Sequence, residues 1–179
     1  GSMGSKTDPN SRISLLASAV KNLMADFHDY TNGDIKVHLI PFSTTSNTTA
    51  TFTVTEDTGY ANVLTFLNGL NGNGFTNYEA PMQSAINWLQ GAQPIDNATT
   101  ISYFVSDGEP NRYLNGSGQP TTGSVAQVLA QMNGTADGTN EIATLKSLSD
   151  EVIGVGINIG ANISNINVID SNGVSINVV

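Results

Sequence analysis

Three segments of this chain carry oxygen ligands that suit a hard divalent cation. Asp107 directly follows an apolar, β-rich run at residues 101–106, so its carboxylate is expected at the carboxyl end of a buried strand. Thr76 precedes a helical pattern, and Ser2 precedes the first helical pattern of the chain. Open α/β sheets bind ligands at the carboxyl ends of their strands. Hydroxyl and carboxylate oxygens gathered there favour Mg²⁺, with Ca²⁺ or Mn²⁺ as alternatives.

Each of these residues also has a simpler structural interpretation. Asp107 begins an Asp-Gly pair, which is a common turn signal. Thr76 could act as a helix N-cap, and Ser2 lies at a chain start, where residues fray. Asp8 is a further candidate ligand, but a turn role before Pro9 is favoured for it. Taken together, the three oxygen ligands favour a metal site over three unrelated structural roles.

Four residues that follow Asp107 would lie on the rim of such a site. They are Glu109, Asn111, Arg112 and Tyr113. Loops at the edge of a sheet often carry binding residues, so we expect these side chains to contact a partner. An ordinary surface loop is an equal alternative for this segment.

Composition restricts the classes of function. The chain has 179 residues, is 39% apolar, and has no cysteine and a net charge of −9. Such a charge repels phosphate backbones, so neither nucleic-acid binding nor binding to anionic membranes is expected. The absence of cysteine excludes thiolate metal sites and a cysteine nucleophile. No apolar run reaches the ~20 residues that a membrane span needs, so direct membrane insertion is not expected.

Strand and helix patterns alternate along the chain. Helices are predicted at residues 12–30, 60–70, 77–90, 125–132 and 141–148, and strands at 35–42, 50–55, 101–106, 151–159 and 174–179. Residues 107–123 read as a polar loop, and residues 161–169 are ambiguous. This order predicts an α/β fold with a mostly parallel, doubly wound sheet and helices on both faces.

Two of the polar segments resemble a known metal site. Residues 75–80 (Phe-Thr-Asn-Tyr-Glu-Ala) and 104–111 (Phe-Val-Ser-Asp-Gly-Glu-Pro-Asn) are similar to the Thr and Asp segments of the metal-ion-dependent adhesion site (MIDAS) of von Willebrand factor type A (VWA) domains. Residues 1–3 (Gly-Ser-Met) resemble the end of the family's Asp-x-Ser-x-Ser segment. The resemblance implies that Ser2, Thr76 and Asp107 are metal ligands.

The resemblance also implies a fold. We expect residues 1–179 to form one VWA-like domain with a three-layer, Rossmann-like arrangement. The family's first central strand, its leading Asp and first Ser, and its last helix have no counterpart in this sequence. We therefore expect either an incomplete domain or part of a split one, with an exposed sheet centre. Residues 1–3 could instead be an expression scar.

The resemblance implies a binding function rather than catalysis. Loops rich in Asn, Thr, Gly and Asp resemble the VWA domains of large bacterial RTX-type surface adhesins. The first hypothesis is an extracellular or cell-surface module whose cation binds the carboxylate of a protein or cell-surface ligand, beside neighbouring adhesin domains. The second is a structural spacer with a stabilising cation. The third, a metal-dependent hydrolase, needs Glu109 or Asp8 as a general base and is least favoured.

Other catalytic signatures are absent from the sequence. His28 and His38 lie on different predicted elements without a further His or Cys partner, so we expect neither to ligate a metal. No nucleophile elbow and no phosphate-binding loop is present.

Overall fold

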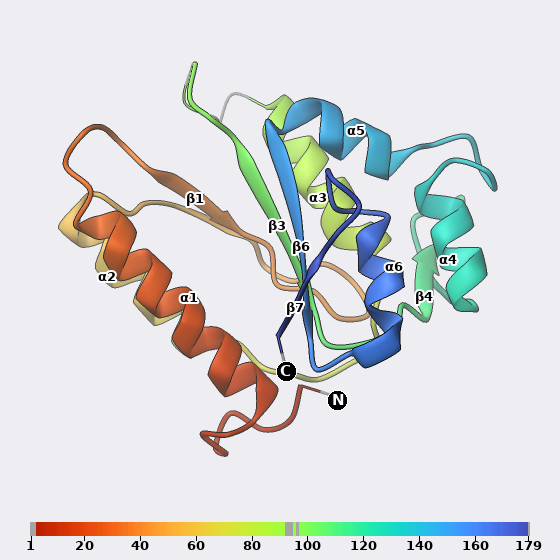
Figure 1. Cartoon of the computed structure of the whole chain (residues 1–179), viewed down its shortest axis with the longest axis horizontal. Coiled ribbons are helices and arrows are strands. Elements are labelled where there is room, and N and C mark those ends of the chain that lie inside the picture. The colour runs from red at the N-terminus through yellow and green to blue at the C-terminus, as the bar shows by residue number, and fades with distance from the viewer. Residues whose placement is uncertain (1–2, 92–94, 96, 179) are drawn as a thin grey trace. The chain divides into compact units, whose positions relative to one another are not determined.

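The computed structural model describes residues 3–91, 95 and 97–178, and the chain divides into two compact units. Unit 1 comprises Gly1–Pro41 and Asn47–Asn73, and unit 2 comprises Phe42–Ser46 and Gly74–Val179. Figure 1 shows the helices and strands of both units. Thr76 and Asp107 belong to unit 2, and Asp8 belongs to unit 1. Ser2 lies outside the described residues.

Unit 1 contains two helices and a two-stranded antiparallel sheet. Its elements are α1 (Arg12–His28), β1 (Lys36–Leu39), β2 (Ala50–Thr53) and α2 (Asp57–Asn68). The Ser11 hydroxyl accepts a hydrogen bond from the Ser14 amide and so caps α1. Four buried apolar side chains form the core of the unit: Met24, Val54, Val63 and Leu67.

Unit 2 contains the parallel sheet. Its helices are α3 (Glu79–Gln90), α4 (Val125–Met132), α5 (Glu141–Leu148), the 3-10 helix η1 (Gly160–Ile163) and α6 (Ser164–Asn167). Its strands are β3 (Ile101–Ser106), β4 (Arg112–Leu114), β5 (Pro120–Thr122), β6 (Glu151–Ile157) and β7 (Ile176–Val178). Strands β3, β6 and β7 pair in parallel in that order, and β4 pairs with β5 in an antiparallel hairpin.

Side-chain alternation gives the parallel sheet one well-packed face. Phe104 of β3 points to this face, where its ring packs 4.8 Å from the ring of Tyr78, centroid to centroid. Val152 of β6 joins the same core, together with Met82 of α3 and Ile166 of α6. Burying such side chains contributes about 1.5–3 kcal/mol each, so this core fixes β3 against α3.

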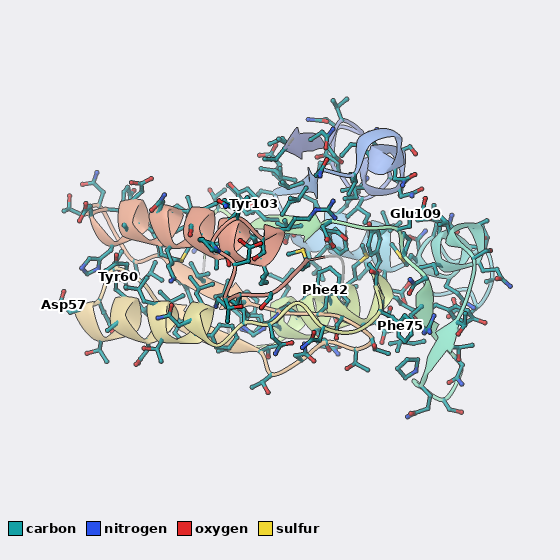
Figure 2. All side chains as sticks on the ribbon, turned by 90° about the horizontal axis from the view of Figure 1, so that it is seen from below. Phe42, Asp57, Tyr60, Phe75, Tyr103 and Glu109 are labelled. Atoms are coloured by element: carbon teal, nitrogen blue, oxygen red, sulfur yellow. The ribbon has the colours of Figure 1, made fainter. Side chains whose placement is uncertain are left out.

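The opposite face of the sheet is apolar but incompletely covered. Ile101 and Tyr103 of β3 are 45% and 52% exposed, and Ile176 and Val178 of β7 are 55% and 49% exposed (Figure 2 labels Tyr103). The expectation of a buried strand at residues 101–106 is therefore wrong for Ile101 and Tyr103. The exposed apolar face itself agrees with the sequence prediction.

The α/β fold class with a parallel sheet is confirmed, and some local predictions need correction, such as the second helix, which is Asp57–Asn68 rather than 60–70. The predicted polar loop at 107–123 contains the β4–β5 hairpin. The ambiguous residues 161–169 contain the end of η1 and α6. The third predicted helix begins at Glu79 rather than at residue 77. None of the helices in the described ranges is both long and apolar enough to cross a bilayer.

Candidate metal centre

Strand β3 places Asp107 at the carboxyl end of the parallel sheet. Ser106, the last residue of β3, lies opposite Gly156 of β6, and Asp107 follows it directly. The Ser106 hydroxyl donates to the Gly108 carbonyl oxygen at 3.3 Å, which shapes the turn around Asp107. The Asp107 side chain is buried, with 8% of its surface exposed. A carboxylate removed from water in this way requires compensating donors or a cation.

Three hydrogen bonds join the Thr76 segment to the chain that follows Asp107. The carbonyl oxygen of Thr76 accepts from the amides of Asn111 at 2.9 Å and Arg112 at 3.1 Å. The Thr76 amide donates to Asn111 Oδ1 at 3.2 Å. The structure therefore brings together two of the three segments that the sequence assigns to the metal site.

A fourth contact reaches the turn itself. The Tyr78 hydroxyl donates to the carbonyl oxygen of Gly108 at 2.7 Å. Burial raises the pKa of Tyr78 to about 12, and the negative charges of Asp107 and Glu109 add to the rise. Tyr78 therefore remains a neutral donor at any physiological pH. The sequence alone does not indicate this role of Tyr78, because nothing in the local pattern shows that its hydroxyl reaches a turn 30 positions away.

Asn77, rather than Thr76, caps helix α3. Asn77 Oδ1 accepts hydrogen bonds from the amides of Glu79 at 3.1 Å and Ala80 at 3.2 Å. The interpretation of Thr76 as the N-cap is therefore wrong. Within the part of the chain that the structure describes, the Thr76 hydroxyl makes no hydrogen bond. The spacing of Asn77 before an acidic first turn is the signal that could have identified the cap.

Asn77 also anchors the loop to a second segment. Its amide donates to the Ser43 carbonyl at 2.8 Å, and its Nδ2 donates to the Thr44 carbonyl at 3.0 Å. Gly74 permits this close approach, because it has a φ of +107° and a Cβ there would lie 2.8 Å from the Ser43 Cβ. The loop that carries Thr76 is therefore held on two sides, by residues 43–44 and by residues 111–112.

The four predicted rim residues occupy different environments. Glu109 is exposed (Figure 2). Arg112 lies with its guanidinium carbon 3.7 Å from the centre of the Phe75 ring, and its Nη1 donates to the Asn111 carbonyl at 2.8 Å. The Asn111 side chain is committed to the Thr76 amide. Tyr113 is half-buried and packs against the core of unit 2.

Other candidates have local structural roles. Asp8 Oδ1 accepts from the Asn10 amide at 2.9 Å, which is the turn role that the sequence favours. His28 stacks on Tyr60 with ring centroids 4.4 Å apart and lies 3.3 Å from Asp57. No group of three or more His, Asp or Glu side chains that could hold a metal is found among the described residues.

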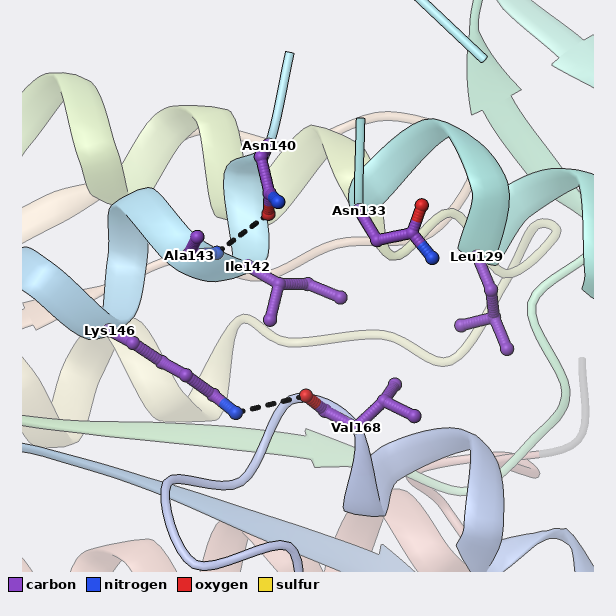
Figure 3. A pocket seen from close by; sticks show the side chains of 7 residues that line it. All are labelled: Leu129, Asn133, Asn140, Ile142, Ala143, Lys146 and Val168. Carbon is purple, nitrogen blue, oxygen red and sulfur yellow. Dashed lines mark hydrogen bonds between the residues drawn. The ribbon is translucent and has the colours of Figure 1, made fainter. Parts of the chain in front are cut away.

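The hollow shown in Figure 3 lies away from Asp107. It has a volume of about 360 Å³ and lies between α4, α5 and Val168. Lys146 spans one side and donates to the Val168 carbonyl at 3.1 Å. The lining is mostly apolar, so the hollow offers few ligands for a cation.

Unit 2 is thus an α/β unit with polar loops at the carboxyl edge of a parallel sheet, an arrangement typical of ligand-binding domains. The family model described as von Willebrand factor type A domain matches residues 1–109. The chain belongs to this family.

One solved structure shows the same fold. The crystal structure of the pilus adhesin SpaC from Lactobacillus rhamnosus GG, in its open conformation, is similar with a TM-score of 0.62 and 10% sequence identity. The match covers 94% of this chain and 26% of that chain. This chain therefore corresponds to about a quarter of the SpaC chain. No curated protein matches it.

Proposed function

We propose that this chain is a non-enzymatic binding module in which Thr76 and Asp107 hold a divalent cation that binds a carboxylate of a partner. The observation that carries the proposal is the set of three hydrogen bonds that ties Thr76 to Asn111 and Arg112, just beyond Asp107. Membership of the VWA family supports the same assignment.

The donor set fits a hard cation. Asp107 offers a buried carboxylate, and the Thr76 hydroxyl makes no hydrogen bond to the described residues. Mg²⁺ binds through one or two carboxylates and retains several waters, one of which an incoming oxygen can replace. The cation would supply the positive charge that a partner's Glu or Asp side chain recognises.

Arg112 prepares the rim for such a partner. Its guanidinium is held by the Phe75 ring and by the Asn111 carbonyl, so little side-chain entropy is lost when it contacts a second carboxylate oxygen. The exposed Glu109 carries the opposite charge. The two residues together would favour one orientation of an acidic ligand over the other.

We place the module at the cell surface, as one part of a larger adhesin of the RTX type. Its lack of cysteine, its net charge of −9 and its polar loops support this context. The similarity of fold to part of a pilus adhesin is consistent with it.

The test uses a short peptide with one central Glu and an otherwise identical peptide with Gln. We expect the Glu peptide, in the presence of Mg²⁺, to shift the backbone NMR signals of Gly108, Asn111 and Arg112. EDTA, Asp107→Asn or Thr76→Val should abolish the shifts, whereas the exposed Asp34→Asn should leave them unchanged. Equal shifts with Glu and Gln peptides would contradict a carboxylate-binding metal.

The spacer hypothesis predicts a different pattern in the same experiment. Mg²⁺ would then raise the unfolding temperature and shift the loop signals, but neither peptide would add to the shift. Mg²⁺ at a hundredfold excess over its dissociation constant adds ~2.7 kcal/mol to the free energy of unfolding, which calorimetry resolves.

A further inference from the structure

Two buried carboxyl groups face each other between helices α3 and α5. Glu79 begins α3 and is 1% exposed, and Glu141 begins α5 and is 4% exposed. The Gln83 side chain bridges them, because its Nε2 donates to Glu79 Oε1 at 3.3 Å and to Glu141 Oε1 at 3.2 Å. These groups are distinct from the candidate metal centre at Thr76 and Asp107.

The remaining oxygens of the pair are not equally satisfied. Glu79 Oε2 accepts a hydrogen bond from the Leu114 amide at 2.7 Å. Glu141 Oε2 is buried and has no hydrogen-bond partner among the residues that the structure describes. In the same residues neither Glu79 nor Glu141 forms an ion pair with Lys, Arg or His. Buried carboxylates without a counter-charge are costly, so the pair requires a proton or a cation.

A hollow with oxygen-bearing walls opens beside this pair. It has a volume of about 210 Å³, and Ile86 is its one apolar lining residue beside Gln83, Asn87, Thr139, Asn140, Glu141 and Thr144. Amide, hydroxyl and carboxylate oxygens are the ligands of hard cations. Glu141 therefore borders a hollow whose other side chains supply further oxygens beside the pair.

Electrostatics favour a cation at the pair. Burial raises the pKa of Glu79 to about 7, and the charges of Glu141 on α5 and Asp137 on the preceding loop add to the rise. Near neutral pH the proton on Glu79 is therefore held weakly enough to be displaced. A divalent cation would neutralise both carboxylates, which a single proton does not.

We propose that Glu79, Glu141 and the side-chain amide of Gln83 form a second cation site, and that it binds Ca²⁺. Ca²⁺ accepts irregular sets of oxygen ligands at 2.3–2.6 Å, whereas Mg²⁺ requires a near-ideal octahedron. A half-turn of the Gln83 amide exchanges the bridging nitrogen for an oxygen, which changes Gln83 from a donor into a ligand. Waters in the hollow complete the coordination. The site does not depend on the proposed adhesion function.

The test is calorimetric titration of Ca²⁺ into the full chain, in two buffers of different ionisation enthalpy at pH 7. The experiment compares wild type with Asp107→Asn, Glu141→Gln and Glu151→Gln, the last being an exposed Glu at the start of β6. We expect Asp107→Asn and Glu151→Gln to retain a Ca²⁺ event that releases protons. Glu141→Gln should weaken that event at least about tenfold, because it removes one of two charged ligands.

Unfolding temperatures give a second readout that does not need measurable binding heat. In EDTA, Glu141→Gln should unfold at a higher temperature than wild type, since it removes a buried unpaired charge. In the Asp107→Asn background, which lacks the first candidate metal centre, added Ca²⁺ should raise the unfolding temperature, and a further Glu141→Gln substitution should remove that rise.

Two results would overturn the second site. One is an unchanged Ca²⁺ response in Glu141→Gln, which would place the ion elsewhere. The other is no Ca²⁺ response in Asp107→Asn, which would mean that the pair holds only a proton. Neither result affects the peptide experiment at Thr76 and Asp107, so failure of the second site and failure of the adhesion proposal are distinguishable.

Discussion

Tyr78 donates its hydroxyl hydrogen to the carbonyl oxygen of Gly108 at 2.7 Å, so the residue that precedes helix α3 directly supports the turn that carries Asp107. The Tyr78 ring is fully buried and packs against Phe104 of β3. The ring and the hydroxyl of Tyr78 together hold the start of α3 against the end of β3.

Replacing Tyr78 by Phe should weaken the contact between α3 and the turn after β3, while the packing of the ring is kept. We expect the free energy of unfolding to fall by about 0.5–1.5 kcal/mol, because the mutation removes one hydrogen bond and leaves the Gly108 carbonyl with only the longer bond from the Ser106 hydroxyl. Urea unfolding measures the change. Tyr113→Phe is the matched control, since Tyr113 is only half-buried and no hydrogen bond of its hydroxyl supports the turn. Equal losses in both variants would contradict a specific role for Tyr78.

Asn77→Ala should be more damaging than an ordinary surface substitution on the same helix. It removes the cap of α3 and the side-chain bond to the Thr44 carbonyl. A lost cap costs about 0.5–2 kcal/mol and an unpaired buried group adds about 1–3 kcal/mol. Asn87→Ala, at an exposed position of α3, should change the free energy of unfolding by less than about 0.5 kcal/mol. Chemical denaturation of both variants tests the difference.

Stability should depend on pH through Glu79. Burial raises its pKa from 4.5 to about 7, so the folded state binds the proton more tightly than the unfolded state. Proton binding at Glu79 therefore adds to the free energy of unfolding. This contribution is fully present below about pH 4.5 and is lost as the pH rises through about 7. Over this range the free energy of unfolding should fall by roughly 3 kcal/mol.

Glu79→Gln should flatten this part of the pH profile, measured by urea unfolding in EDTA so that no cation replaces the proton. The exposed Glu151→Gln should keep the wild-type profile. A Glu79→Gln profile that falls as steeply as wild type between pH 4.5 and 7 would show that another group is responsible.

The elements that carry Thr76 and Asp107 could be predicted because their signals are local. An apolar β-rich run followed by Asp-Gly indicates a strand end, and a helical pattern after a glycine-rich loop indicates a helix start. The hairpin of β4 and β5 escaped prediction because each strand has only three residues and one begins with Pro120. Such short strands give no reliable alternation.

Contacts between distant residues could not be read from the sequence. Gln83 and Glu141 are 58 positions apart, and each alone reads as a polar residue on the surface of a helix. Only the packing of α3 against α5 buries Glu141 and brings it to Gln83. The cap by Asn77 was predictable in principle, but Thr76 competes for the same role one position earlier.

The most direct measurement of the central claim is a crystal structure of the chain grown with Mn²⁺, in which anomalous scattering locates the ion. The proposal predicts a peak within coordination distance of both the Thr76 hydroxyl and the Asp107 carboxylate, and its loss in Asp107→Asn. Thr76 and Asp107 oxygens that contact only protein and water, with the ion bound elsewhere, would contradict it.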